Sequence, residues 1–175
     1  MGANEEGTID ALQALHAAVI DPLIAQNSGH LFKSTGDGFL VEFPSVVAAL
    51  RCSIEIQKSM AEQGPLFPTG DRARFRIGIN LGDVILRDGD VFGDGVNIAA
   101  RLENLARPGG ICISADVYRH VAGKINANFV NGGRQRLKNI AEPVEVYHVS
   151  IDEASPPLLA DISAVRTRWS SGLRL

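Results

Sequence analysis

The sequence predicts a single α+β domain built on an antiparallel-rich sheet. Helical and strand-like periodicities alternate along the chain, and several strand-like runs are joined by turns that contain Gly and Asp. No internal repeat interrupts this order. With 175 residues, of which 45% are hydrophobic, the chain is long enough to bury one core.

The first third of the chain is expected to contain a helix, a hairpin and a second helix. Apolar residues at helical spacing predict a helix over 5–26, which Pro22 should kink or interrupt. Apolar-rich segments flank a Gly-Asp-Gly sequence within His30–Phe43, and this predicts a tight hairpin around Asp37. Ser45 is a suitable N-cap for the next helix, because its hydroxyl can accept from a free backbone N–H of the first turn.

The remaining chain is expected to add strands around two more helices. The alternating, β-branched run 74–86 predicts one strand that ends at a turn including Asp90. Further elements are expected in this order: a helix from Gly93–Asp94 to the Pro-Gly-Gly sequence at 108–110, a strand over 111–114, a helix over 115–121, and a hairpin formed by 133–138 and 143–149. The domain should therefore span residues 1–150, and 151–175 should be a flexible tail.

Composition excludes several classes of function. A net charge of −3 gives no support for non-specific nucleic-acid binding, which requires a basic surface. An aromatic content of 6%, without paired aromatics on adjacent strands, also argues against an RNA-binding domain. Cys52 and Cys112 lie in apolar runs and do not have metal-ligand spacing. We therefore expect both to be reduced core residues of a cytoplasmic protein. No apolar stretch has the length of a membrane span, and the N-terminus is unlike a signal peptide, so no membrane partner is expected.

Asp37 is the first candidate for chemistry. It stands between two glycines, so a metal ion and a polyphosphate could approach its carboxylate closely. Lys33 lies four residues earlier on the same expected strand and could direct a cation toward such a ligand. An isolated Asp-Gly sequence, by contrast, is usually an ordinary hairpin turn.

A second candidate group lies on the third expected helix. Asn97 and Arg101 are four residues apart, so both should project from one side of that helix. An amide beside a guanidinium suits a ribose next to a phosphate, because the guanidinium fork binds phosphate oxygens. The alternative is a solvated helix face. Taken alone, Asp90 is a turn residue and Lys138 a surface lysine.

Three motifs, in order along the chain, resemble the catalytic domain of class III adenylate/guanylate cyclases. They are KSTGDGFLVEF at 33–43, RIGINLGDV at 76–84 and DVFGDGVNIAARL at 90–102, and the resemblance extends over about 5–149. It implies the nucleotide cyclase fold, with a ferredoxin-like core, an antiparallel-rich mixed sheet and helices on one side. It also implies cyclic AMP synthesis from ATP in a homodimer, with Mg²⁺ or Mn²⁺ and with active sites between the subunits.

The resemblance implies a role for each candidate residue. Asp37 corresponds to the second metal-binding aspartate, and Asn97 to the asparagine that orients the ribose. Arg101 corresponds to the arginine that neutralises charge on the pentavalent phosphorus, and Lys138 to the lysine that binds the triphosphate.

The purine would be read by Lys33 and Asp90, if the resemblance holds. This pair fits adenine, since a lysine donates to N1 and a carboxylate accepts from the exocyclic amine. Guanine presents the opposite pattern and should be rejected. The short arm between Asp83 and Asp90 leaves GTP open as the substrate.

The family's first strand, which carries its first metal-binding aspartate, has no counterpart before the first expected helix. Its loss should leave backbone groups unpaired inside the sheet. Three explanations are open: the natural protein supplies the strand upstream, the chain is catalytically weak, or residues 157–165 of the tail fill the gap with Asp161 as the substitute carboxylate. A non-catalytic module that binds a nucleotide or a partner is the alternative function.

Overall fold

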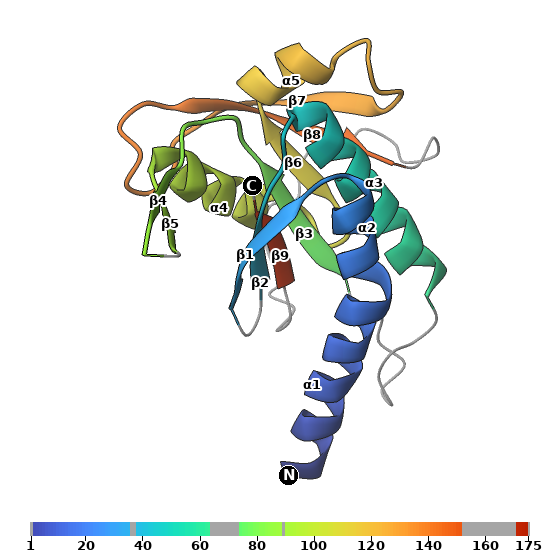
Figure 1. The fold of residues 1–175 in the computed structure, drawn as a ribbon. Coiled ribbons are helices and arrows are strands. Elements are labelled where there is room, and N and C mark those ends of the chain that lie inside the picture. Colours follow the sequence, from blue (N-terminus) through green and yellow to red (C-terminus); the bar gives the residue numbers. More distant parts are fainter. Residues whose placement is uncertain (1, 36–37, 64–73, 89, 152–170, 175) are drawn as a thin grey trace.

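The computed structural model describes residues 2–35, 38–63, 74–88, 90–151 and 171–174, and a mixed seven-stranded sheet forms its centre. Figure 1 shows how the helices are arranged around this sheet. The strand order is β1-β2-β9-β3-β6-β8-β7. The strands are β1 His30–Thr35, β2 Gly38–Glu42, β3 Phe75–Ile79, β6 Ile111–Ser114, β7 Asn128–Gln135, β8 Val144–Ser150 and β9 Ser171–Arg174. Pairs β1–β2, β6–β8 and β7–β8 are antiparallel, whereas β9 is parallel to β2 and β3, and β3 is parallel to β6. The predicted α+β class is therefore confirmed.

The first helical run is interrupted just before Pro22, as the sequence predicts. Helix α1 (Gly2–Leu15) leads into a π-helical turn (His16–Ile20), and α2 (Asp21–Gln26) follows with the proline in its first turn. Proline lacks an N–H and its ring clashes with the carbonyl four residues earlier, so a regular helix cannot pass through it unchanged. The wider π turn changes the hydrogen-bond spacing at this point. The N-terminal part of α1 extends away from the sheet (Figure 1).

One face of the sheet is covered by α2, α3 (Val46–Glu62) and α5 (Ala115–Val121). Helix α3 begins where expected, since the Ser45 hydroxyl accepts from the backbone N–H of Ala48 at 3.1 Å. The side chains buried between these helices and the sheet form the main core and include Ile20, Val41, Leu50, Ile56, Ile77, Ile79, Ile111, Ile113 and Val117. This burial of branched apolar side chains supplies most of the driving force for folding.

Helix α4 (Asp94–Leu105) packs on the opposite face, so the expectation of helices on one side only is wrong for this helix. Strand β3 alternates its side chains, with Ile77 and Ile79 in the main core and Gly78 facing α4. A Cβ atom at Gly78 would lie 2.3 Å from the backbone oxygen of Ala99 and 2.3 Å from the backbone nitrogen of Glu103. The backbones of α4 and β3 are therefore in direct contact.

The strand predicted over 74–86 ends at Ile79, and this boundary is a correction. Residues 80–84 leave the sheet and cross the start of α4, where the side-chain amide of Asn80 donates to the carbonyl of Gly95 at 3.2 Å. The chain then forms a separate two-stranded hairpin, β4 (Ile85–Arg87) and β5 (Asp90–Phe92). Alternation in sequence cannot show that a run of strand-forming residues changes sheets.

The inner position between β2 and β3 is filled by β9, which lies within the expected tail. The backbone groups expected to be unpaired there are paired with Ser171–Arg174 instead. Residues 157–165, including Asp161, lie outside the described residues.

Both cysteines are fully buried and free of disulfide bonds, as predicted for reduced core residues. Burial raises the pKa of the Cys52 thiol to about 12, with a smaller contribution from Glu55, and burial raises the pKa of the Cys112 thiol to about 12. Among the residues that the structure describes, no helix is long and apolar enough to cross a membrane.

Substituting Gly78 should separate α4 from β3. Gly78→Ala places a methyl group against two backbone atoms that cannot move independently, so we expect the free energy of unfolding to fall by about 3 kcal/mol. Chemical denaturation monitored by circular dichroism measures this loss.

Gly7→Ala is the matched control. Gly7 lies in α1, and no atom lies within 4 Å of the place that an alanine methyl group would take, so alanine should leave stability unchanged or raise it by up to about 1 kcal/mol. Equal stability of Gly78→Ala and the native chain would contradict the close packing of α4 on β3.

Candidate functional site

Helix α4 presents two of the candidate residues on its solvent side. Ala99 and Leu102 are buried against the sheet, whereas Asn97 is exposed and Arg101 is half-buried. The helix begins after Gly93, whose carbonyl accepts from the backbone N–H of Asn97 at 3.3 Å. The four-residue spacing thus places both polar side chains away from the core, as the sequence predicts.

Arg101 also meets another candidate segment. Its Nε donates to the backbone carbonyl of Lys138 at 3.3 Å, although the two residues are 37 positions apart. Lys138 is exposed and begins a turn in which Asn139 has a φ of 64°. The buried side chain of Leu137 anchors this turn. The fold therefore brings Asn97, Arg101 and the backbone of Lys138 to one region.

Strand β1, which carries Lys33, lies against strand β5 of the same chain, which carries Asp90. Lys33 is on β1, where it is paired with Leu40 of β2, and Asp90 is the first residue of β5, paired with Arg87. Their side chains are outside what the structure describes, as is Asp37. The pairing of Thr35 with Gly38 confirms the predicted hairpin.

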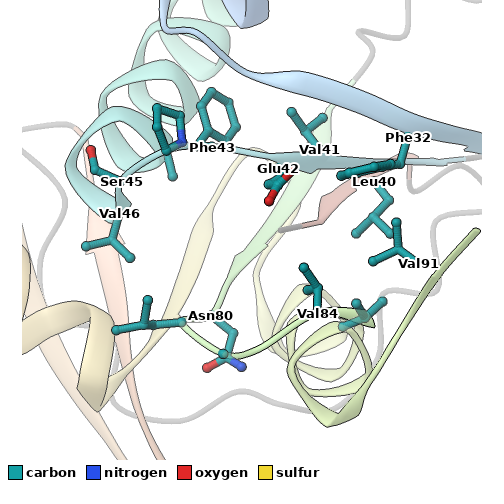
Figure 2. A pocket seen from close by; sticks show the side chains of 15 residues that line it. Phe32, Leu40, Val41, Glu42, Phe43, Ser45, Val46, Asn80, Val84 and Val91 are labelled. Atoms are coloured by element: carbon teal, nitrogen blue, oxygen red, sulfur yellow. The ribbon is translucent and has the colours of Figure 1, made fainter. Parts of the chain in front are cut away.

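A cavity of about 130 Å³ lies between β2 and the 80–84 loop. Figure 2 shows the side chains of Leu40 and Glu42 facing Val84 across this space. Most of the lining is apolar, and the polar side chains are those of Glu42, Ser45 and Asn80. A mainly apolar cavity with a few polar groups is the usual form of a small-molecule site.

Sequence reasoning missed the apolar residues of this cavity. Three of them are direct neighbours of candidate polar residues: Phe32 precedes Lys33, Val91 follows Asp90, and Val96 precedes Asn97. Phe32 and Val91 lie on β1 and β5 and Val96 lies on α4, so the neighbouring candidate residues belong to the elements that line the cavity. The adjacency in sequence was the available signal.

The residues that the structure describes offer few side chains that could bind a metal ion together. No group of three or more His, Cys, Asp or Glu side chains among them could hold a metal ion. Asp37, the candidate carboxylate, lies outside these residues. One carboxylate is chemically sufficient only where phosphate oxygens and water complete an octahedral Mg²⁺ shell.

The β4–β5 hairpin and the loop before it expose large apolar side chains. Ile85 and Phe92 are paired across the hairpin and are 58% and 51% exposed, and Leu81 is 46% exposed. We call these three residues the arm patch. Side chains of this size rarely cluster on a surface that contacts only water.

Comparison with known proteins gives a consistent assignment. The model of the family described as adenylate and guanylate cyclase catalytic domain matches residues 3–150. A Rhizobium meliloti protein named "Putative adenylate cyclase 3" is 41% identical over 162 residues, which cover 91% of this chain but 28% of that protein. The chain thus spans less than a third of that relative's length.

Solved structures agree with the sequence match. The adenylate/guanylate cyclase/hydrolase from Silicibacter pomeroyi is 42% identical, with a TM-score of 0.78 over 83% of this chain and 85% of that one. The guanylate cyclase domain of RhGC from Catenaria anguillulae, solved in complex with GTP, is 19% identical, with a TM-score of 0.65 over 86% of this chain and 85% of that one. The second likeness concerns the fold alone.

Proposed function

Since this chain belongs to the adenylate and guanylate cyclase catalytic domain family, we propose that it converts ATP into 3′,5′-cyclic AMP and pyrophosphate. The ribose 3′-oxygen would form a bond to the α-phosphorus and lose its proton, while the bond from that phosphorus to the pyrophosphate oxygen breaks. The observation that carries the proposal is the hydrogen bond between Arg101 and the backbone of Lys138, beside Asn97.

Asn97, Arg101 and Lys138 would act on the sugar and phosphates. The exposed amide of Asn97 can orient the ribose, and the exposed ammonium of Lys138 can bind the triphosphate. The Nε of Arg101 is directed at a backbone carbonyl, which fixes the guanidinium while its other N–H groups remain able to bind phosphate oxygens. A fixed cation is effective here because it needs no reorganisation as charge develops on phosphorus.

The purine would bind at the cavity. Phe32, Leu40, Val91 and Val96 supply apolar walls for a flat ring. Lys33 and Asp90 adjoin two of these walls in sequence, on strands that lie against each other. A lysine donor and a carboxylate acceptor match adenine and mismatch guanine, which favours ATP over GTP.

Mg²⁺ or Mn²⁺ is the proposed cofactor, with Asp37 as a protein ligand. A hard carboxylate oxygen suits either ion, and the triphosphate oxygens and water would complete the shell. When bound, the ion would neutralise phosphate charge.

We further propose a homodimer with active sites at its interface, working in the cytoplasm in cyclic-nucleotide signalling. The arm patch supports an interface, because a second copy of the chain would cover Leu81, Ile85 and Phe92. Nucleic acid and membrane are not among the proposed partners.

A non-catalytic module that binds a nucleotide or a partner is the second candidate. It requires only the mainly apolar cavity and exposed polar groups such as Asn97 and Lys138, without a bound metal ion. ATP binding by calorimetry without any cyclic nucleotide in the presence of Mn²⁺ would support this alternative and overturn the catalytic proposal.

Arg101→Ala should abolish most turnover. Loss of the positioned charge should lower kcat with ATP and Mn²⁺ by about 100-fold or more. Cyclic AMP quantified by mass spectrometry measures the rate. Stability should change by less than about 1 kcal/mol, since the bond to Lys138 is at the surface.

Arg119→Ala is the control for Arg101→Ala, because Arg119 is exposed on α5 and pairs there with Asp116. Its kcat should match that of the native chain. Equal rates in all three proteins would contradict a role for Arg101.

Lys33→Ala and Asp90→Ala should each weaken the choice of base. We expect the ratio of kcat/KM for ATP to that for GTP to fall by about tenfold or more, because the buried edge of adenine loses a partner. Lys138→Ala is the control, since the triphosphate is common to both nucleotides and both rates should fall together. If both of the first two variants kept the native ratio, Lys33 and Asp90 would have no part in base recognition.

Phe92→Asp should weaken the proposed homodimer. A charge within the arm patch would be desolvated on association, so the dissociation constant should rise by about tenfold or more. Sedimentation equilibrium measures it. Val130→Asp on β7, where Val130 is 37% exposed and apart from the arm patch, should leave association unchanged. A native chain that is monomeric at all concentrations would rule out this interface.

A further inference from the structure

Strand β9 occupies an inner position of the sheet although it lies outside the family match. The match ends at residue 150, and β9 is formed by Ser171–Arg174. Its neighbours β2 and β3 belong to the matched region. The feature is therefore a property of this chain's own C-terminal segment.

The space between β2 and β3 has two facing rows of backbone donors and acceptors. Gly38–Leu40 pair with β9 on one side, and Phe75–Gly78 pair with it on the other. Without a strand between them, both edges would lose their partners, and buried backbone groups without partners are costly. This space fits an extended segment that can pair on both edges.

The register suits the residues that fill it. Leu173 is aligned with Phe39 and Ile77, which are both buried in the main core, so its position falls on the core face of the sheet. Gly172 is aligned with Gly38 and Arg76. The core position of the occupant therefore favours an apolar residue.

We propose that the space between β2 and β3 is a strand-acceptor site and that residues 171–174 are its detachable occupant, supplied by the same chain. The occupant is only four residues long and is parallel to both neighbours, an arrangement slightly less stable per residue than antiparallel pairing. Gly172 weakens it further, because glycine loses more conformational freedom when it is ordered.

Release of β9 should be a local event. On their other edges, β2 remains paired with β1 and β3 with β6, and α4 still packs on β3 at Gly78. These pairings keep each half of the sheet intact, and the main core, which contains Val41 of β2 and Ile77 of β3, holds the two halves together while the inner edges open.

Release would also affect the site. Gly38, which pairs with Gly172, directly follows Asp37. The C-terminal segment would therefore determine how firmly the Asp37 hairpin is held to the sheet, a consequence that rests on the proposed function. The strand pairing itself is tested without reference to activity.

Hydrogen–deuterium exchange of the full chain with Gly172→Pro tests the proposal. Proline removes the N–H at the centre of β9, so peptides covering 38–42 and 75–79 should exchange about tenfold faster or more. Peptides covering 128–135 and 144–150, from the far edge of the sheet, should be unchanged. Unchanged exchange everywhere, or equal acceleration in all four peptides, would overturn a detachable inner strand.

A disulfide cross-link tests the same pairing in a fully folded chain. Leu40 and Arg174 are aligned in neighbouring strands, where Cα atoms lie about 5 Å apart, within the range that a disulfide bridges. Mild oxidation of Leu40→Cys with Arg174→Cys should yield a cross-link within one chain, seen by mass spectrometry of peptides. Val130→Cys with Arg174→Cys, whose strands are far apart in the sheet order, should not cross-link. No cross-link in the first variant, or one formed only between two chains, would overturn the assignment.

Discussion

Helix α4 can lie directly on strand β3 because Gly78 has no side chain. The helix backbone occupies the place that a Cβ atom would take, with its Ala99 oxygen and Glu103 nitrogen 2.3 Å from that position. A second close approach, between Gly82 and Gly95, holds the 80–84 loop on the start of the same helix. The position of Asn97 and Arg101 follows from these two backbone contacts, because both residues project from the side of α4 that faces away from the sheet.

The two faces of the sheet have different roles. The face covered by α2, α3 and α5 holds the main core, whereas α4 leaves space on its own side beside the β4–β5 hairpin. The cavity forms there, between β2 and the 80–84 loop (Figure 2). The cavity reaches Val41 and Ala49 of the main core, whereas Asn97 and Lys138 are exposed, so substitutions at these two exposed residues need not affect folding.

The C-terminal segment joins the two halves of the sheet. Strands β1–β2 and β3–β6–β8–β7 are connected through β9 alone within the described sheet, so the hairpin around Asp37 and the strand that contacts α4 meet through Ser171–Arg174. The proposed catalytic groups therefore belong to two parts of the domain, and β9 is the strand that connects these parts. Their relative placement depends on pairing at both of its edges.

The sequence by itself determined the α+β class, the start of α3 at Ser45, the hairpin around Asp37 and the exposed side of α4. These features depend on local rules, namely periodicity, a side-chain cap and the conformations that Asp-Gly allows. The spacing of Asn97 and Arg101 also sufficed to place them together.

Only the tertiary structure decided the rest. It placed α4 on the opposite face, ended β3 at Ile79, brought Lys138 to Arg101 and inserted residues 171–174 between β2 and β3. Each of these outcomes is a contact between segments distant in the chain, and such contacts are set by which backbone edges and surfaces meet. A local pattern identifies the element that forms, but it does not contain the identity of its neighbour.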